Sequence, residues 1–228
     1  MSVIITRARF IAGSAFFGML FSPGSAFGQD QCPPLQPVAL EPGSRMVYAV
    51  DAGGGNRFSP AFLIDVEAAE AFTVDLMQWM QVDEAGEPMS AEPHSTRAMI
   101  AGVIPVSETV GGNTRRFVYR GDPAASLSAL GPGDSFETLV TQIYPAAGRY
   151  RTIRVESDFT VRHSGCESRE LGGTQITMLI YDVEYDRGDS RGETRRARTR
   201  YWVPALYGIA VRNQTEGSGA IAEVVEIR

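Results

Sequence analysis

The two histidines of the chain, His94 and His163, are its only candidates for a histidine base. Ser135, within Gly-Asp-Ser-Phe, has neighbours like those of some hydrolase nucleophiles, and a serine nucleophile needs an adjacent base. Hydrolases of that kind carry the base late in the chain, whereas no histidine follows His163 here. We therefore interpret Ser135 as a turn residue and predict no catalytic residue. A secreted hydrolase acting on envelope material is kept as the alternative function.

Charged side chains alternate along two segments near the C-terminus. The carboxylates of Asp182, Glu184 and Asp186 share one strand face and would suit a cation or a sugar. The following segment is rich in arginine, and we favour ion pairs between two neighbouring strands on a solvated sheet face, each contributing at most about 1 kcal/mol. The arginines are Arg195, Arg196, Arg198 and Arg200.

No cofactor or metal site is predicted. The glycine run 53–55 is followed by neither a helix nor a lysine, so it lacks the features of a phosphate-binding loop. Two cysteines do not supply the ligand set of a structural zinc site. We expect both glycine run and cysteines to be structural.

The N-terminal segment 1–28 predicts a secretory signal peptide. Arg7 and Arg9 form its positive region, the uncharged run 10–21 forms its hydrophobic region, and a small-x-small site places cleavage before Gln29. The hydrophobic run is shorter than the roughly 20 residues of a membrane-spanning helix, and no later segment is long enough. We therefore predict a periplasmic or secreted protein without a transmembrane segment after cleavage.

The charge of the chain argues against nucleic acid as a partner. The 228 residues carry a formal net charge of -6, and removal of Arg7 and Arg9 with the signal peptide makes it -8. An acidic domain does not attract phosphate backbones. All 21 basic residues are arginine, which we attribute to codon usage.

Cys32 and Cys166 are the two cysteines, and both remain after cleavage. In an oxidising compartment an isolated pair usually forms a disulfide, which would tie the N-terminal lead-in to the second half of the chain. Two free thiols are the alternative.

The chain after the signal peptide predicts a proline-rich lead-in, 29–43, and one antiparallel β domain, 44–228. The domain repeats short runs of β-branched and aromatic residues, separated by turn residues, and shows no sustained helical period. We expect an all-β fold of about ten strands: a curved antiparallel sheet, as a half-barrel or β-sandwich. A helical turn is expected at 124–130. The strand candidates include 45–51, 62–67, 72–82, 96–106, 115–120, 136–144, 150–163, 175–186, 195–203, 209–213 and 221–227.

Two weaker patterns add further hypotheses. Similar Pro-Gly turns suggest a duplication of segments 41–120 and 131–228. Arg187-Gly188-Asp189-Ser190 spells an integrin-binding tetrapeptide, and Arg120-Gly121-Asp122 repeats its first three residues. An adhesin is therefore a second alternative, although Gly and Asp are ordinary turn residues.

The most distinctive segment of the sequence predicts a bend that is rich in aromatic residues. Tyr201 and Trp202 end a strand, Pro204 bends the chain, and Gly208 after Tyr207 permits close approach of another segment. We interpret these five residues as a sheet corner at the opening of a barrel or half-barrel, or as one wall of a ligand groove.

This bend, together with Gly-Cys-Glu and Gly-Gly-Thr-Gln-Ile in 165–176, resembles the bacterial secreted half-barrel domains of unknown function that include the TapB-like group. The resemblance covers about 130–228 and departs at Val203, which stands in an aromatic position, and at an inserted Tyr207. It implies an envelope protein with a curved sheet and no catalytic residues. We accordingly expect a non-catalytic protein that binds an apolar ligand or a protein partner on a concave sheet face.

Overall fold

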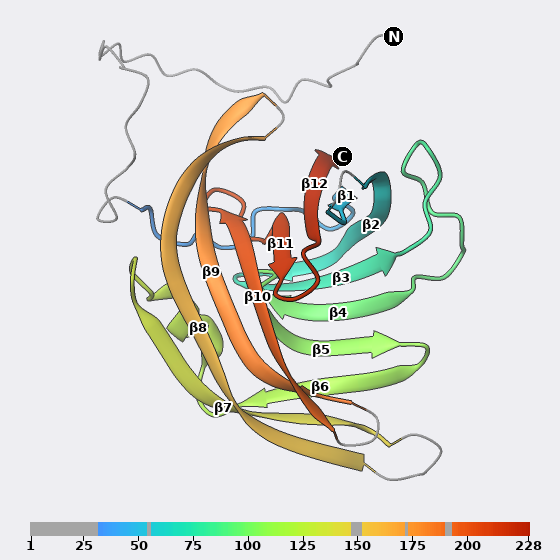
Figure 1. Cartoon of the computed structure of the whole chain (residues 1–228). Helices are drawn as coiled ribbons and strands as arrows, with labels where there is room; N and C mark the ends of the chain where they lie inside the picture. Colours follow the sequence, from blue (N-terminus) through green and yellow to red (C-terminus); the bar gives the residue numbers. More distant parts are fainter. Residues whose placement is uncertain (1–31, 54–55, 147–151, 172, 190–192) are drawn as a thin grey trace, which may run out of the picture.

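The structure is a computed structural model, which describes residues 32–53, 56–146, 152–171, 173–189 and 193–228. The expected signal peptide, 1–28, lies outside the described residues. Antiparallel strands dominate the fold, and one short helix is present in the described part of the chain (Figure 1). The strands are β1 (Arg45–Asp51), β2 (Arg57–Glu70), β3 (Thr73–Trp79), β4 (Ser95–Ile100), β5 (Ile104–Val110), β6 (Asn113–Tyr119), β7 (Ser135–Pro145), β8 (Thr152–Leu171), β9 (Thr174–Gly188), β10 (Thr194–Pro204), β11 (Arg212–Thr215) and β12 (Ile221–Ile227), and the helix is α1 (Pro123–Ser128).

The strands form a closed barrel, in which each strand pairs with its neighbours in the chain. Closure comes from β1, which pairs antiparallel with β2 on one side and with β12 on the other. The all-β, antiparallel prediction is therefore confirmed. The expected count of about ten strands and the open half-barrel or sandwich are corrected to a closed barrel of twelve described strands. Pairing between the first and last strands leaves no local sequence pattern, which is why the sequence did not predict closure.

The predicted single strand 96–106 is wrong, because a tight turn divides it into β4 and β5. Ala101 and Gly102 have positive φ angles of 50° and 66°. A Cβ atom on Gly102 would lie 2.9 Å from the backbone nitrogen of Ala210, so a glycine is needed at this close approach. The apolar residues on both sides of the turn hid it from a reading of hydrophobic periodicity.

Strands β9 and β10 bury side chains on both faces. Tyr181 of β9 and Val203 of β10 belong to a first core cluster that also contains Phe159, whereas Met178 and Trp202 belong to a second cluster. Successive strand residues point to opposite faces, so the two clusters lie on opposite sides of the β9–β10 sheet. Farther along, the second face carries the charged residues instead. Both faces of the β9–β10 sheet are therefore buried only near the corner at the end of β10.

The lead-in from Cys32 has no helix or strand but is packed against the barrel. Leu35 is buried in the first core cluster. Backbone bonds join the Val38 nitrogen to the Ala71 oxygen at 2.8 Å and the Ala39 nitrogen to the Tyr207 oxygen at 3.0 Å. The predicted disulfide is present, since Cys32 is bonded to Cys166 of β8. These contacts fix the lead-in across the end of the barrel that carries the corner.

Candidate apolar binding groove

A groove of about 580 Å³ lies where the lead-in crosses the barrel end, within the range of small-molecule sites. Four segments form its walls: the lead-in, the hairpin between β8 and β9, the corner after β10, and β12. Its lining residues are Pro33, Pro34, Gln36, Leu171, Thr174, Gln175, Ile176, Thr177, Ala205, Leu206, Tyr207, Val224, Val225, Glu226 and Ile227.

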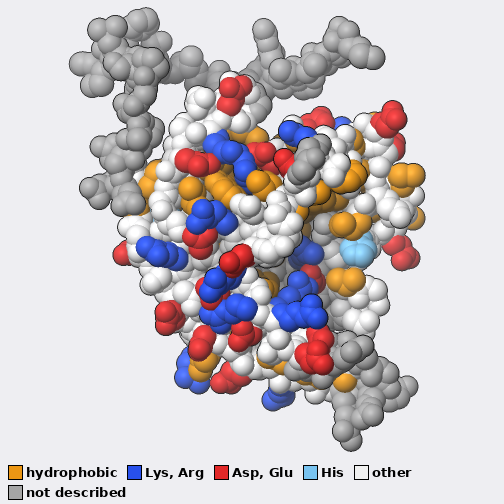
Figure 2. Space-filling view, in the orientation of Figure 1, with side chains coloured by type: hydrophobic (Ala, Val, Ile, Leu, Met, Phe, Trp, Pro, Cys, Tyr) orange, Lys and Arg blue, Asp and Glu red, His pale blue; other side chains and the backbone are white. Residues whose placement is uncertain are grey.

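Apolar side chains at the rim of the groove are open to solvent. Leu206 is 66% exposed and Val225 is 43% exposed, although both are large and hydrophobic. Figure 2 shows hydrophobic side chains gathered over the ends of β9 and β12, while charged side chains cover the sheet below. Glu226 is the one charged side chain of the lining. Exposed apolar surface around a hollow is typical of a place where an apolar group binds.

The structure divides the five residues of the predicted corner between two sides of the sheet. Tyr207 lines the groove, and a turn there brings the nitrogens of Tyr207 and Gly208 to 3.0 Å from the Pro204 oxygen. Trp202 is buried below the groove, where the Arg212 guanidinium lies 4.7 Å from its ring centroid. Tyr201 points to the opposite face. Of the five predicted residues only Tyr207 lines the groove, and the corner adds Ala205 and Leu206, which were not predicted.

Gly208 fixes the distance between the corner and the lead-in. Its φ is +63°, and a Cβ atom would lie 2.3 Å from the Gln36 oxygen and 2.6 Å from the Pro37 oxygen. Only a residue without a side chain allows the two backbones to approach this closely. The lead-in wall of the groove consequently depends on this glycine.

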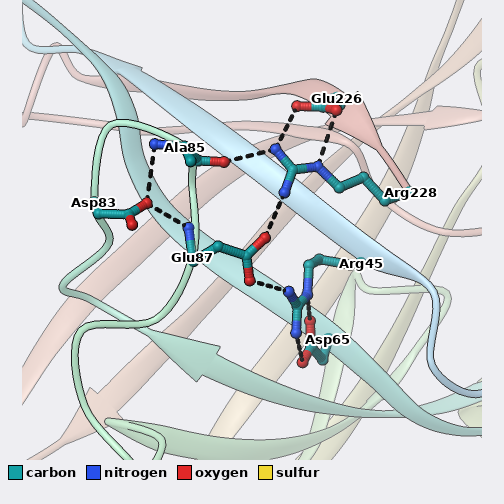
Figure 3. A network of polar contacts seen from close by, with 7 residues as sticks. All are labelled: Arg45, Asp65, Asp83, Ala85, Glu87, Glu226 and Arg228. Atoms are coloured by element: carbon teal, nitrogen blue, oxygen red, sulfur yellow. Dashed lines mark hydrogen bonds and ion pairs between the residues drawn. The ribbon is translucent and has the colours of Figure 1, made fainter. Parts of the chain in front are cut away.

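The wall formed by β12 is held by a network of ion pairs (Figure 3). Arg228 contacts Glu226 at 2.9 Å and Glu87 at 2.7 Å, and Glu87 also accepts from Arg45 at 2.6 Å. Arg45 continues the chain of contacts to Asp65 on β2. The hydrogen bond from Arg228 lowers the pKa of the Glu226 carboxyl below its ordinary 4.5. The network joins the last strand to β1, β2 and the 83–87 loop.

We expect Arg228→Gln to lower the free energy of unfolding by about 1 kcal/mol at neutral pH, because both partners are well exposed to solvent. Because the pKa of the Glu226 carboxyl is lower in the folded protein than its ordinary value, its ion pair stabilises the fold above that ordinary value. This stabilisation is lost as the pH falls through the lowered pKa of the folded state. The difference from wild type should therefore shrink below about pH 4.5. Urea denaturation at neutral and acidic pH measures it. Arg195→Gln, at an exposed arginine without an ion pair among the described residues, is the control; an equal loss there would contradict the prediction.

The structure does not bring together the residues that the catalytic alternative would need. Ser135 is exposed at the start of β7 and pairs with Arg162. His163 is the next residue, so it points to the other face, where it is 2% exposed and its Nδ1 lies 3.2 Å from the Leu130 oxygen. His94 lies in an exposed loop before β4. The structure therefore brings no histidine side chain to Ser135.

The charged strands pair as predicted. In the β9–β10 ladder Arg200 is opposite Asp182, Arg198 opposite Glu184 and Arg196 opposite Asp186. Arg200 donates two hydrogen bonds to Asp182, at 2.7 and 2.9 Å. These carboxylates are occupied by guanidinium groups. Among the described residues no group of three His, Cys, Asp or Glu side chains could hold a metal ion.

The adhesion motif is not displayed as a free loop. Arg187 and Gly188 end β9, Gly188 is buried, and Arg187 binds Glu108 at 2.9 Å. Ser190 lies outside the described residues. In the second instance Asp122 caps α1 by accepting bonds from the Ala124 and Ala125 nitrogens, which also confirms the helical turn expected nearby.

No family model and no curated protein matches the chain. Among bacterial structures, the chain is similar to the hypothetical lipoprotein YmcC of Escherichia coli, with 14% identity and a TM-score of 0.46 over 87% of this chain and 90% of that one. It is also similar to a provisionally described exported protein with a YmcC-like fold from Bacteroides fragilis, with 12% identity and a TM-score of 0.40 over 86% of this chain and all of that one. A provisionally described lipoprotein of Parabacteroides distasonis has 10% identity and a TM-score of 0.39 over 87% of this chain and all of that one. At these values no residue role is transferred. The resemblance to the TapB-like group stays a prediction.

Among the described residues no helix is long and apolar enough to cross a membrane.

Sequence reasoning missed most of the groove lining, because the lead-in, the β8–β9 hairpin and β12 are far apart in the chain. The one available signal was Leu206, an apolar residue in a turn, where polar residues are usual.

Proposed function

We propose that this chain is an exported, non-catalytic protein of the cell envelope that binds the acyl chain of a lipid in the apolar groove. One observation carries the proposal: the groove of about 580 Å³ is walled mainly by aliphatic residues and is open at a rim where Leu206 and Val225 face solvent. The predicted signal peptide supports an envelope location, where acyl chains are abundant.

The lining favours an acyl chain over a charged or sugar-like ligand. The side chains of Ile176, Ala205 and Val224 offer no hydrogen bonds, and most of the lining is aliphatic or proline. The polar side chains of the lining are Gln36, Thr174, Gln175, Thr177, Tyr207 and Glu226. Burial of apolar surface would supply the affinity, at roughly 25 cal/mol per Å² before the costs of association. A protein partner that inserts an apolar side chain is the other candidate, and the test below separates the two.

We expect Leu206→Asp to weaken binding of the fluorescent fatty acid cis-parinaric acid, because it places a carboxylate at the apolar rim. A loss of about tenfold or more in affinity is expected, since a desolvated charge costs more than one lost apolar contact. Titration of the mature disulfide-bonded protein, followed by probe emission, measures it.

Met89→Asp is the matched control. Met89 is 68% exposed in a loop outside the groove, so it receives the same charge at the same exposure. Saturable binding that falls in Leu206→Asp alone supports the proposal. No saturable binding of the probe to wild type, or an equal loss of affinity in both variants, contradicts it. A protein partner would be favoured if wild type binds no probe but associates with envelope proteins, and if Leu206→Asp does not associate with them.

A further inference from the structure

A second hollow, of about 100 Å³, lies on the face of the sheet opposite Trp202, beside the first core cluster. It contains Arg97 from β4, Glu108 from β5 and Arg187 from β9, against the rings of Phe117, Tyr185 and Tyr201. Arg97 and Glu108 are opposite each other in the β4–β5 ladder, whereas Arg187 comes from β9, much later in the chain. The barrel brings them together at a site that the apolar groove does not use.

Glu108 holds the two guanidinium groups in place. Its Oε1 lies 3.1 Å from Arg97 Nη2, and its Oε2 lies 2.9 Å from Arg187 Nη2. The Glu108 side chain is 15% exposed, whereas those of Arg97 and Arg187 are 37% and 52% exposed. The carboxylate therefore lies inside, and the two arginines extend from it toward solvent.

Positive charge exceeds negative charge around this hollow. Arg115 lies opposite Glu108 in the β5–β6 ladder, donates to the Gly188 oxygen at 2.8 Å and stacks on the Tyr144 ring. Burial and the charge of Arg187 lower the pKa of the Arg115 guanidinium. Three arginines thus surround one carboxylate, and an excess of positive charge remains even with Asp189, which acts on Tyr144, included.

Two guanidinium nitrogens of this cluster lack an acceptor. Arg97 Nε and Arg115 Nη1 are shielded from solvent and have no hydrogen-bond partner within the described part of the chain. A shielded charged donor without an acceptor is costly. Arg97 lines the hollow and Arg115 lies beside it, so an acceptor that fills the hollow and reaches Arg97 Nε would be favoured. Guanidinium groups match the paired oxygens of carboxylate and phosphate.

We propose that this hollow binds a single oxyanion group, a carboxylate or a phosphate monoester, between Arg97 and Arg187. The hollow, of about 100 Å³, suits one such group. Glu108 keeps the two arginines in position before binding, and Arg115 adds positive potential from the side. The remainder of the anionic molecule extends into solvent past the exposed arginines.

The test titrates sodium phosphate, sodium acetate and sodium chloride into the mature disulfide-bonded protein at constant ionic strength and follows the melting temperature. A ligand that binds the folded state raises the melting temperature in a saturable manner. Saturation with phosphate alone identifies a phosphate site, saturation with acetate alone a carboxylate site, and saturation with both a general oxyanion site. A rise that equals that of chloride, or no rise, overturns the proposal.

Variants locate the site. Arg97→Gln and Arg187→Gln should each raise the dissociation constant about tenfold or more, the change expected when a charged hydrogen bond is lost. Arg116→Gln, on β6 but on the exposed face, should leave it unchanged. Equal affinity in Arg97→Gln, Arg187→Gln and Arg116→Gln would exclude this site.

A measurement on the wild-type protein covers the case in which an arginine variant fails to fold. The side-chain Nε–H resonance of Arg97 should shift with the bound fraction when the saturating anion is added, as it gains an acceptor. An unshifted Arg97 resonance at saturation would overturn the proposal regardless of the variants.

Discussion

The Cys32→Ser/Cys166→Ser double variant should unfold at a melting temperature roughly 10–20 °C below that of the wild-type protein. The bridge joins residues 134 positions apart. The loop-entropy relation gives about 5 kcal/mol for a loop of this length, and a domain of about 200 residues loses roughly 2–4 °C for each kcal/mol. Calorimetry on oxidised wild type and on the variant measures the difference.

A reducing agent provides the internal control. It should lower the melting temperature of wild type toward that of the double variant and leave the variant unchanged. A thiol count on the unreduced mature protein should find none. A wild-type melting temperature that does not respond to full reduction would show that the bridge contributes nothing to stability.

The second large effect is expected at Gly208. Gly208→Ala should lower the free energy of unfolding by about 2–4 kcal/mol, the sum of a forced contact and an unfavourable positive φ. The new Cβ would meet the backbone oxygens of Gln36 and Pro37, which cannot rotate away as a side chain can. Urea denaturation measures the loss, and weaker cis-parinaric acid binding should accompany it because the lead-in wall moves.

Gly219→Ala separates the contact from the strain. Gly219 has φ +65°, nearly that of Gly208, and nothing lies within 4 Å of its added Cβ. This variant should cost only about 1–2 kcal/mol. If both variants lose the same stability, close packing of the lead-in against the corner is not the cause.

Local features of the fold were predictable from the sequence. Alternation in 175–186 identified most of β9 and the face on which its carboxylates lie, and the matching arginines predicted the neighbouring strand. The helical turn expected at 124–130 corresponds to α1. These features depend on residues close together in the chain or on adjacent strands.

Features that depend on distant pairing were not predictable. Neither β12 beside β1 nor Arg187 beside Glu108 leaves a periodic signal, because the partners come from opposite parts of the chain. The same holds for the groove, whose walls meet only after the lead-in crosses the barrel end. The cysteines were the exception, since a lone pair in an exported chain specifies its own partner.

Closure through β1 and β12 has a consequence for how the protein acquires its structure. The first strand cannot pair with β12 until the last residues of the domain are available, so closure of the barrel has to wait for the entire chain. Pairing of this kind has a high contact order and is intrinsically slow. A product cut before Ile221 would expose two unpaired strand edges and be prone to aggregation.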